Sequence, residues 1–187
     1  MLNSLLHVHM SYVVGLLVRG VTRLDNIVYV VSCISSIIAM YTADTLSPLG
    51  GGIHVEEMGF PRDIVACRRD RQLYVADKDH GIWRVSTDDH SYINWLPRES
   101  ALTAMFKANK LSLTSRGILV TSHKPPALFE YNTVDAQMLR DVQLPQSVKS
   151  LYHGVETSRD TFLICHQGTS EDTQQYAVRK LFLFLCV

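Results

Sequence analysis

The chain lacks the sequence features that usually mark a zinc site or a disulfide framework. Its 187 residues include four cysteines, which are far apart and form no Cys-x-x-Cys pair. Structural zinc sites normally take ligands from such close pairs, and disulfide scaffolds are short and rich in cysteine. Free buried thiols are the simplest interpretation, and they favour a reducing compartment such as the cytoplasm.

Two further motifs are missing. Gly50–Gly52 are not followed by Gly-Lys-Ser/Thr, so they do not form a phosphate-binding loop, and the chain has no Gly-x-Ser-x-Gly nucleophile elbow. Glycine clusters usually mark turns, so this one predicts a flexible connection in an outer hairpin, ahead of a strand over Ile53–Met58.

The chain also has no excess of charge of either sign. Lysine plus arginine and aspartate plus glutamate number 18 each, which gives a formal net charge of zero. A general nucleic-acid binder carries a basic footprint, so nucleic acid is not an expected partner.

Residues Met1–Val18 contain no aspartate, glutamate, lysine or arginine, yet they do not match a targeting segment. A signal peptide needs a basic region before its apolar run, and a membrane span needs about 20 predominantly apolar residues. Asn3, Ser4 and His7 interrupt this stretch. We expect 1–17 to be an apolar N-terminal segment that packs on the first unit of a domain over 18–187, and membrane association is not expected.

That domain contains an internal repeat. Four strand-like segments align along the chain: Ile27–Cys33, Gln72–Lys78, Gly117–His123 and Thr161–Gln167. Their equivalent positions Tyr29, Tyr74, Leu119 and Leu163 are 45, 45 and 44 residues apart. A fixed period of this length is typical of a repeat architecture.

Further strand-like segments surround each copy. Those before it are Val18–Leu24, Asp63–Cys67, Leu102–Lys107 and Val148–His153. Those after it are Ile38–Ala43, Ile82–Thr87, Leu128–Thr133 and Gln175–Val178, and outer strands are expected at Tyr92–Leu96 and Leu139–Leu144. Four short strands in about 45 residues predict an all-β chain of four-stranded antiparallel propeller blades. The blades would cover about 18–61, 62–101, 102–147 and 148–187.

Arg69–Ser86, RDRQLYVADKDHGIWRVS, resembles an NHL repeat. The matching residues are Leu73, Tyr74, Val75, Ala76, Asp77, His80, Ile82 and Val85, whereas Gly81 replaces an arginine that is frequent in the family. The resemblance implies a propeller that typically has six blades and binds partners through one propeller face. Four blades allow a fragment, a four-bladed closure or an arc completed by assembly, and we favour an incomplete propeller.

The ends of the second strands supply the candidate site, because equivalent ends should meet at one face of a propeller. The candidate partner-binding residues there are Asp77, His80, His123, His166 and Gln167. Since no tight ligand spacing occurs among them, we assign no metal, cofactor or catalytic residue. Trp83 and Trp95 are expected to pack between blades.

The expected function is therefore a non-enzymatic protein–protein interaction module. The alternative is a fragment of a calcium-dependent, six-bladed propeller enzyme of the lactonase or esterase type, which such a resemblance also permits. Calcium binds several oxygen ligands, but the available candidates do not recur at one position of the repeat. These candidates are Glu56, Glu57, Asp63, Asn109 and Glu156. Propellers often serve binding instead of catalysis, which favours the interaction module.

Overall fold

The structure is a computed structural model that describes residues 17–98, 107–123, 125–167 and 176–182. Every regular element in those ranges is a β-strand. Within them, no helix is long and apolar enough to cross a membrane. The strands form four separate antiparallel sheets, which confirms the predicted all-β, propeller-type fold. The N-terminal segment 1–17, which was expected to pack on the first unit, lies outside this description except for Leu17.

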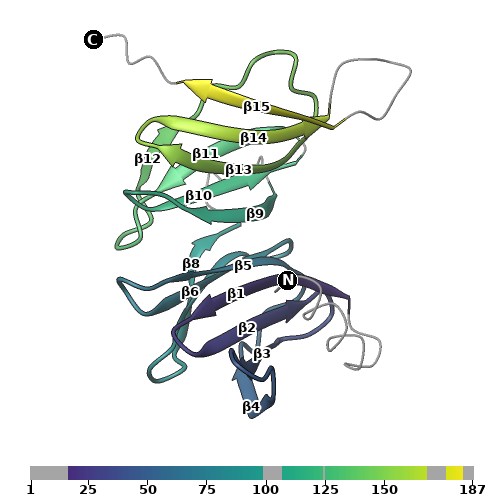
Figure 1. Ribbon diagram of the computed structural model, residues 1–187, viewed down its shortest axis with the longest axis vertical. Helices are drawn as coiled ribbons and strands as arrows, with labels where there is room; N and C mark the ends of the chain where they lie inside the picture. Colours follow the sequence, from purple (N-terminus) through teal and green to yellow (C-terminus); the bar gives the residue numbers. More distant parts are fainter. Residues whose placement is uncertain (1–16, 99–106, 124, 168–175, 183–187) are drawn as a thin grey trace.

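The four sheets follow one another along the chain, and each is a simple meander (Figure 1). The first sheet contains β1 (Val18–Leu24), β2 (Ile27–Ser32), β3 (Ile37–Thr42) and β4 (Pro48–His54). The second contains β5 (Pro61–Cys67), β6 (Gln72–Asp77), β7 (Gly81–Ser86) and β8 (Tyr92–Pro97). The third contains β9 (Ala108–Leu113), β10 (Ile118–Ser122), β11 (Ala127–Tyr131) and β12 (Met138–Asp141). The fourth contains β13 (Leu151–Ser158), β14 (Thr161–Gln167) and β15 (Tyr176–Phe182).

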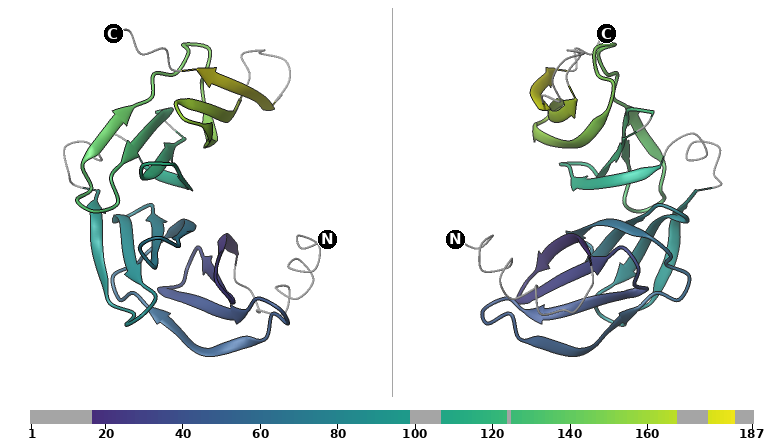
Figure 2. Two further views of the ribbon diagram at one scale, coloured as in Figure 1. Left: turned by 60° about the vertical axis from the view of Figure 1, so that its left-hand side comes forward. Right: turned by 90° about the vertical axis from the view of Figure 1, so that its right-hand side faces the viewer.

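The sheets are arranged around an open arc (Figure 2). The first strands contact one another in turn, β1 with β5, β5 with β9 and β9 with β13, so they form the inner edge of the arc. The first and fourth sheets lie at its two ends, and the ring is not closed (Figure 2, left). The prediction of an incomplete propeller is therefore confirmed.

The second strand of each sheet carries apolar side chains on both faces, and in the second and third sheets each of these faces packs against a neighbouring sheet. In β6, Leu73 and Val75 join an apolar cluster with Tyr29 of the first sheet. The alternate residue Tyr74 joins a different cluster with Ile118 of the third sheet. Successive side chains of a strand point to opposite faces, so a strand between two sheets becomes a continuous apolar run. This requirement explains the repeat that the sequence shows.

The two tryptophans pack inside these junctions, as expected. Trp83 belongs to the cluster between the first and second sheets, and Trp95 to the cluster between the second and third. The ring centroids of Trp95 and Tyr74 are 5.0 Å apart in an edge-to-face arrangement, which aromatic pairs prefer.

Equivalent hairpin turns connect the first two strands of three sheets. Asp25, Arg71 and Asp160 adopt positive φ angles of 53°, 51° and 62° at these turns. Arg71 also pairs with Asp25 (2.9 Å) and Asp88 (2.7 Å) at the surface, where ion pairs contribute little stability.

Two inner strands lie later in the chain than the sequence pattern predicted. The third sheet begins with Ala108–Leu113 instead of Leu102–Lys107, and the fourth begins with Leu151–Ser158 instead of Val148–His153. Inner strands run beside the axis of the arc, where polar side chains such as Lys110 are accommodated. An apolar pattern therefore locates them poorly.

Three predictions about the outer strands were also wrong. Gly50–Gly52 are part of β4 instead of a connection, and the predicted strand Ile53–Met58 ends at His54. Gly51 and Gly52 have positive φ angles beside a register shift opposite β3, which is the behaviour of a β-bulge. The outer strand of the third sheet is Met138–Asp141 instead of Leu139–Leu144. Three strands are described in the fourth sheet, and residues 183–187 after them lie outside the described part of the chain.

Replacing Gly81 with alanine should destabilise the second sheet. Gly81 has a φ of 100°, and an added Cβ would lie 2.2 Å from the carbonyl oxygen of Leu96. Gly81→Ala should therefore lower the free energy of unfolding by about 2 kcal/mol or more, measured by urea denaturation. The matched control is Gly50→Ala, whose Cβ would meet nothing within 4 Å and which should stay within about 0.5 kcal/mol of the original. Equal losses for the two variants would contradict the strained conformation at Gly81.

Two buried tyrosines should make stability depend on alkaline pH. Burial raises the pKa of Tyr74 and of Tyr131 to about 12, above the ordinary value of 10.0. The unfolded chain loses these protons first, so stability is complete below pH 10 and falls as pH rises towards 12. Urea midpoints should fall between about pH 9 and about pH 11, and less steeply in a Tyr74→Phe/Tyr131→Phe variant. Equal slopes would exclude the two phenols as the cause.

Candidate functional site

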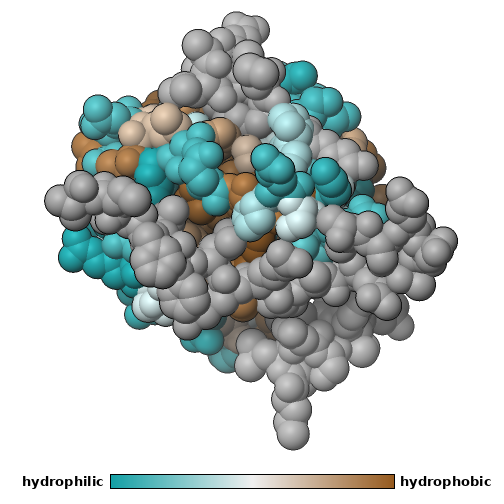
Figure 3. Space-filling model, turned by 90° about the horizontal axis from the view of Figure 1, so that it is seen from above, coloured by the Kyte–Doolittle hydropathy of each residue, from teal (hydrophilic) through white to brown (hydrophobic). Residues whose placement is uncertain are grey.

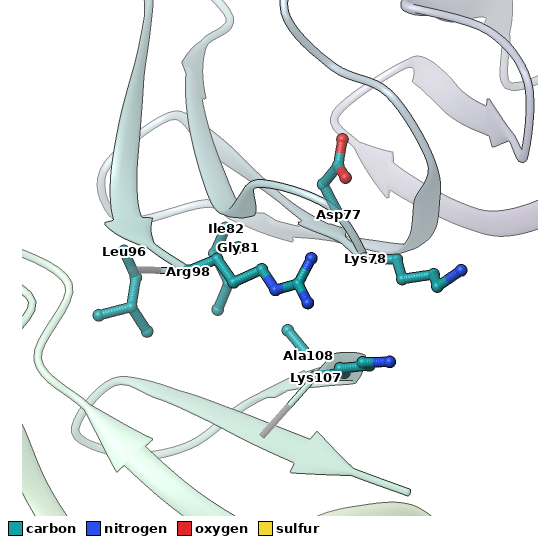
Figure 4. Close-up of a pocket in the computed structure, with 8 residues that line it drawn as sticks. All are labelled: Asp77, Lys78, Gly81, Ile82, Leu96, Arg98, Lys107 and Ala108. Atoms are coloured by element: carbon teal, nitrogen blue, oxygen red, sulfur yellow. The ribbon is translucent and has the colours of Figure 1, made fainter. Parts of the chain in front are cut away.

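A pocket lies between the second and third sheets, beside the end of β6 (Figure 4). Its cavity volume is about 10 Å³, room for about one water molecule, and the pocket is partly open to solvent. Its lining comes from the ends of β6, β7, β8 and β9: Asp77, Lys78, Gly81, Ile82, Leu96, Arg98, Lys107 and Ala108. Three chain segments distant in sequence therefore build one site.

Three cationic residues surround this pocket, and we call Lys78, Arg98 and Lys107 the cationic triad. Lys78 follows β6, Arg98 follows β8 and Lys107 precedes β9. Their charged ends are directed to the same side of the pocket (Figure 4). The apolar part of the lining is buried and comes from Ile82, Leu96 and Ala108. Such a site suits a carboxylate at its open side, because cations bind carboxylates.

The carboxylate of Asp77, the first predicted site residue, already accepts hydrogen bonds from several backbone N–H groups. Its side chain is buried and accepts hydrogen bonds from the backbone N–H groups of Gly59 (2.8 Å), Asp79 (2.7 Å) and Phe60 (3.3 Å). The carboxylate thereby fixes the turn after β6 to the segment that enters the second sheet. This role shapes the pocket wall and leaves Asp77 little capacity for a ligand.

The four other predicted residues lie at or just beyond ends of second strands, with different surroundings. His80 is partly exposed, with its Nδ1 3.6 Å from Asp77 Oδ1. His123 is half-buried, with Nδ1 3.1 Å from the carbonyl oxygen of Leu151.

His166 is buried, and its Nδ1 lies 2.8 Å from the carbonyl oxygen of its neighbour Gln167. The structure thus joins Asp77 to His80 and His166 to Gln167. It shows no contact between predicted residues of different sheets in the described chain. Their part in a shared partner-binding face stays a prediction.

Sequence reasoning also missed a row of equivalent residues on the inner strands, Gly20, Asp63, Lys110 and His153. Each pairs with the equivalent position of a second strand. Asp63 accepts a hydrogen bond from the Leu111 N–H (3.0 Å) and lies 3.4 Å from Lys110 Nζ. Burial raises the pKa of the Asp63 carboxyl, and the Lys110 charge opposes that shift. The regular spacing of these residues was a usable signal, but it was hidden by the misplaced inner strands of the third and fourth sheets.

The described residues contain no group of three histidine, cysteine, aspartate or glutamate side chains placed to hold a metal ion. The cationic triad was also missed by sequence reasoning. Its members come from three different segments, so no local spacing could reveal them. Alignment of strand ends across the second and third sheets was the only available signal.

Removing the Asp77 carboxylate should unfold the turn that bounds the pocket. Asp77→Ala leaves four backbone donors, including the His80 N–H, without their acceptor, so we expect a loss of about 2–4 kcal/mol in the free energy of unfolding, measured by urea denaturation. Asp77→Asn retains one acceptor oxygen and should lose less. His80→Ala, at the partly exposed partner, should change stability by less than about 1 kcal/mol. A neutral Asp77→Ala variant would contradict the structural role.

Comparisons with known proteins agree with the fold. No family model and no curated protein matches the chain. Among solved structures, the computationally designed Ika4 protein has a TM-score of 0.61 at 10% identity, over 91% of this chain and 93% of that chain. A chain of a nidogen/laminin complex has a TM-score of 0.63 at 12% identity, over 83% of this chain and 59% of that chain.

The WD40 β-propeller domain of Doa1 has a TM-score of 0.60 at 16% identity, over 81% of this chain and 48% of that chain. The chain thus spans about half the length of the Doa1 chain and about three fifths of the nidogen/laminin chain that it matches. At these identities the likeness concerns the fold alone. The chain is a scaffold of propeller-type repeats.

Proposed function

We propose that the protein is a non-catalytic interaction scaffold that binds an acidic segment of a protein partner at the cationic triad. The observation that carries this proposal is the convergence of Lys78, Arg98 and Lys107 on a pocket with an apolar lining. The resemblance of Arg69–Ser86 to NHL repeats supports it, because that family binds partners through loops on a propeller face. The pocket lies beside such a loop, between β6 and β7.

The charge of the chain favours a peptide partner over nucleic acid. The cavity itself, about 10 Å³, has room for about one water molecule, so a partner would meet the cations at its open mouth. A nucleic-acid surface would need an extended basic stripe, whereas this chain has balanced charge. A glutamate or aspartate of the partner would place its carboxylate among the cations at the mouth of the pocket.

The test is binding of a short fluorescein-labelled peptide of alternating glutamate and leucine, followed by fluorescence anisotropy. A Lys78→Glu/Lys107→Glu variant should bind about tenfold or more weakly, because two attractive charges become repulsive. Added salt should also weaken binding, since these side chains are near the surface.

Two controls make this measurement specific. Lys149→Glu alters an exposed lysine outside the pocket and should leave binding unchanged. A peptide with glutamine in place of glutamate should bind weakly to every variant. If the double variant and the Lys149→Glu control bind the glutamate peptide equally well, the cationic triad is not the binding site.

A further inference from the structure

The two ends of the arc carry sheet faces that no described sheet covers. On the first sheet, Val21, Val30 and Ala39 are directly opposite one another across β1, β2 and β3 and so share a face. Tyr29 on the other face packs against the second sheet. We call the face with Val21 the first outward face.

The fourth sheet has a corresponding uncovered side. Phe162 and Ile164 pack against the third sheet. The alternate residues Leu163 and Cys165 are directly opposite Val155 and His153 of β13, and these four residues define the last outward face. Seen from above the fourth sheet, apolar side chains are visible between hydrophilic ones (Figure 3).

Each outward face carries large apolar side chains that remain accessible. The exposed fractions are 41% for Val21 and 44% for Ile37 at the first outward face and 36% for Leu163 at the last. Val28 and Val30 of β2, in the middle of the first outward face, are buried at 5% and 6%, so its accessible side chains lie on β1 and β3 to either side. Exposed apolar side chains gathered on one face mark a contact site.

The repeat makes these two faces complementary to each other. At each junction within the chain, one sheet contributes the face of its second strand that carries Tyr29, Tyr74 or Leu119. The next sheet contributes the opposite face of its own second strand, which carries Leu73, Ile118 or Phe162. By the repeat period, the last outward face, with Leu163, is equivalent to the faces that carry Tyr29, Tyr74 and Leu119. The first outward face, with Val28, is equivalent to the faces that carry Leu73, Ile118 and Phe162.

We propose that a second copy of this chain covers both outward faces. The fourth sheet of each copy packs on the first sheet of the other, so two copies form a closed ring with two new junctions of the kind already present three times in each chain. The arc matches about half the length of the Doa1 propeller chain, so a second arc of equal length supplies what a closed ring lacks. Head-to-tail contacts of this type close when the rotation between copies completes a circle.

The internal junctions indicate which residues meet across the new ones. Ser112 Oγ donates to the carbonyl oxygen of Gly154 (2.8 Å) across the third junction. In the repeat, Val155 corresponds to Ser112, and Val21 corresponds to Gly154. Val155 of one copy therefore lies against Val21 of the other, which is an apolar contact between inner strands.

Sedimentation velocity of the full chain over a range of concentrations tests the proposal. We expect a reversible dimer, with no larger species. Val155→Lys and Val21→Glu should each raise the dimer dissociation constant by at least about tenfold, because a charge enters both apolar junctions. The matched control Val134→Lys changes a valine that is 78% exposed outside both faces and should leave the dimer intact.

An equimolar mixture of Val155→Lys and Val21→Glu should recover the dimer. In the mixed pair one junction carries both substitutions with opposite charge, and the other carries neither. Circular dichroism must show unchanged β-structure for each variant, so that dissociation is not confused with unfolding. A monomer at all concentrations, an open polymer, a dimer insensitive to both substitutions, or no recovery in the mixture would each overturn the proposal.

Discussion

A strand that is apolar on both faces needs a neighbouring sheet on each face, and the arrangement of the sheets follows from this constraint. Val75 of β6 needs the first sheet, and Ala76 beside it needs the third. A single sheet of this kind cannot bury both faces, so each unit depends on its neighbours for stability. The same constraint explains why the period of about 45 residues is visible in the sequence, and why the two ends of the arc differ from its middle.

Buried polar groups fix how the sheets are joined. Glu130 of β11 contacts Arg140 (2.6 Å), Arg116 (3.3 Å) and the hydroxyl of Thr114, while Arg140 also reaches Asp160 of the fourth sheet (2.6 Å). On the inner edge, Asp63 holds the third sheet through the backbone N–H of Leu111. Such charge-assisted hydrogen bonds are directional, so they fix the position of sheets that apolar packing alone would allow to slide.

The sequence predicted the second strands well because they carry the constraint described above. β2, β6, β10 and β14 match the aligned segments to within one or two residues. The inner strands of the third and fourth sheets were misplaced because Lys110 and His153, near the axis, interrupt the apolar alternation. Gly50–Gly52 resembled a loop, although glycines in a bulged strand have the same composition. The cationic triad could not be predicted, because only the packing of the second sheet on the third brings its three segments together.

The central claim is that neighbouring sheets stabilise one another through the faces of their second strands. Amide hydrogen exchange at a protein concentration low enough to keep the chain monomeric tests this claim directly. The account predicts that β6 and β10, which are covered on both faces, exchange more slowly than β2 and β14 at the ends of the arc. Exchange that is slower in β2 or β14 than in β6 and β10 would contradict it.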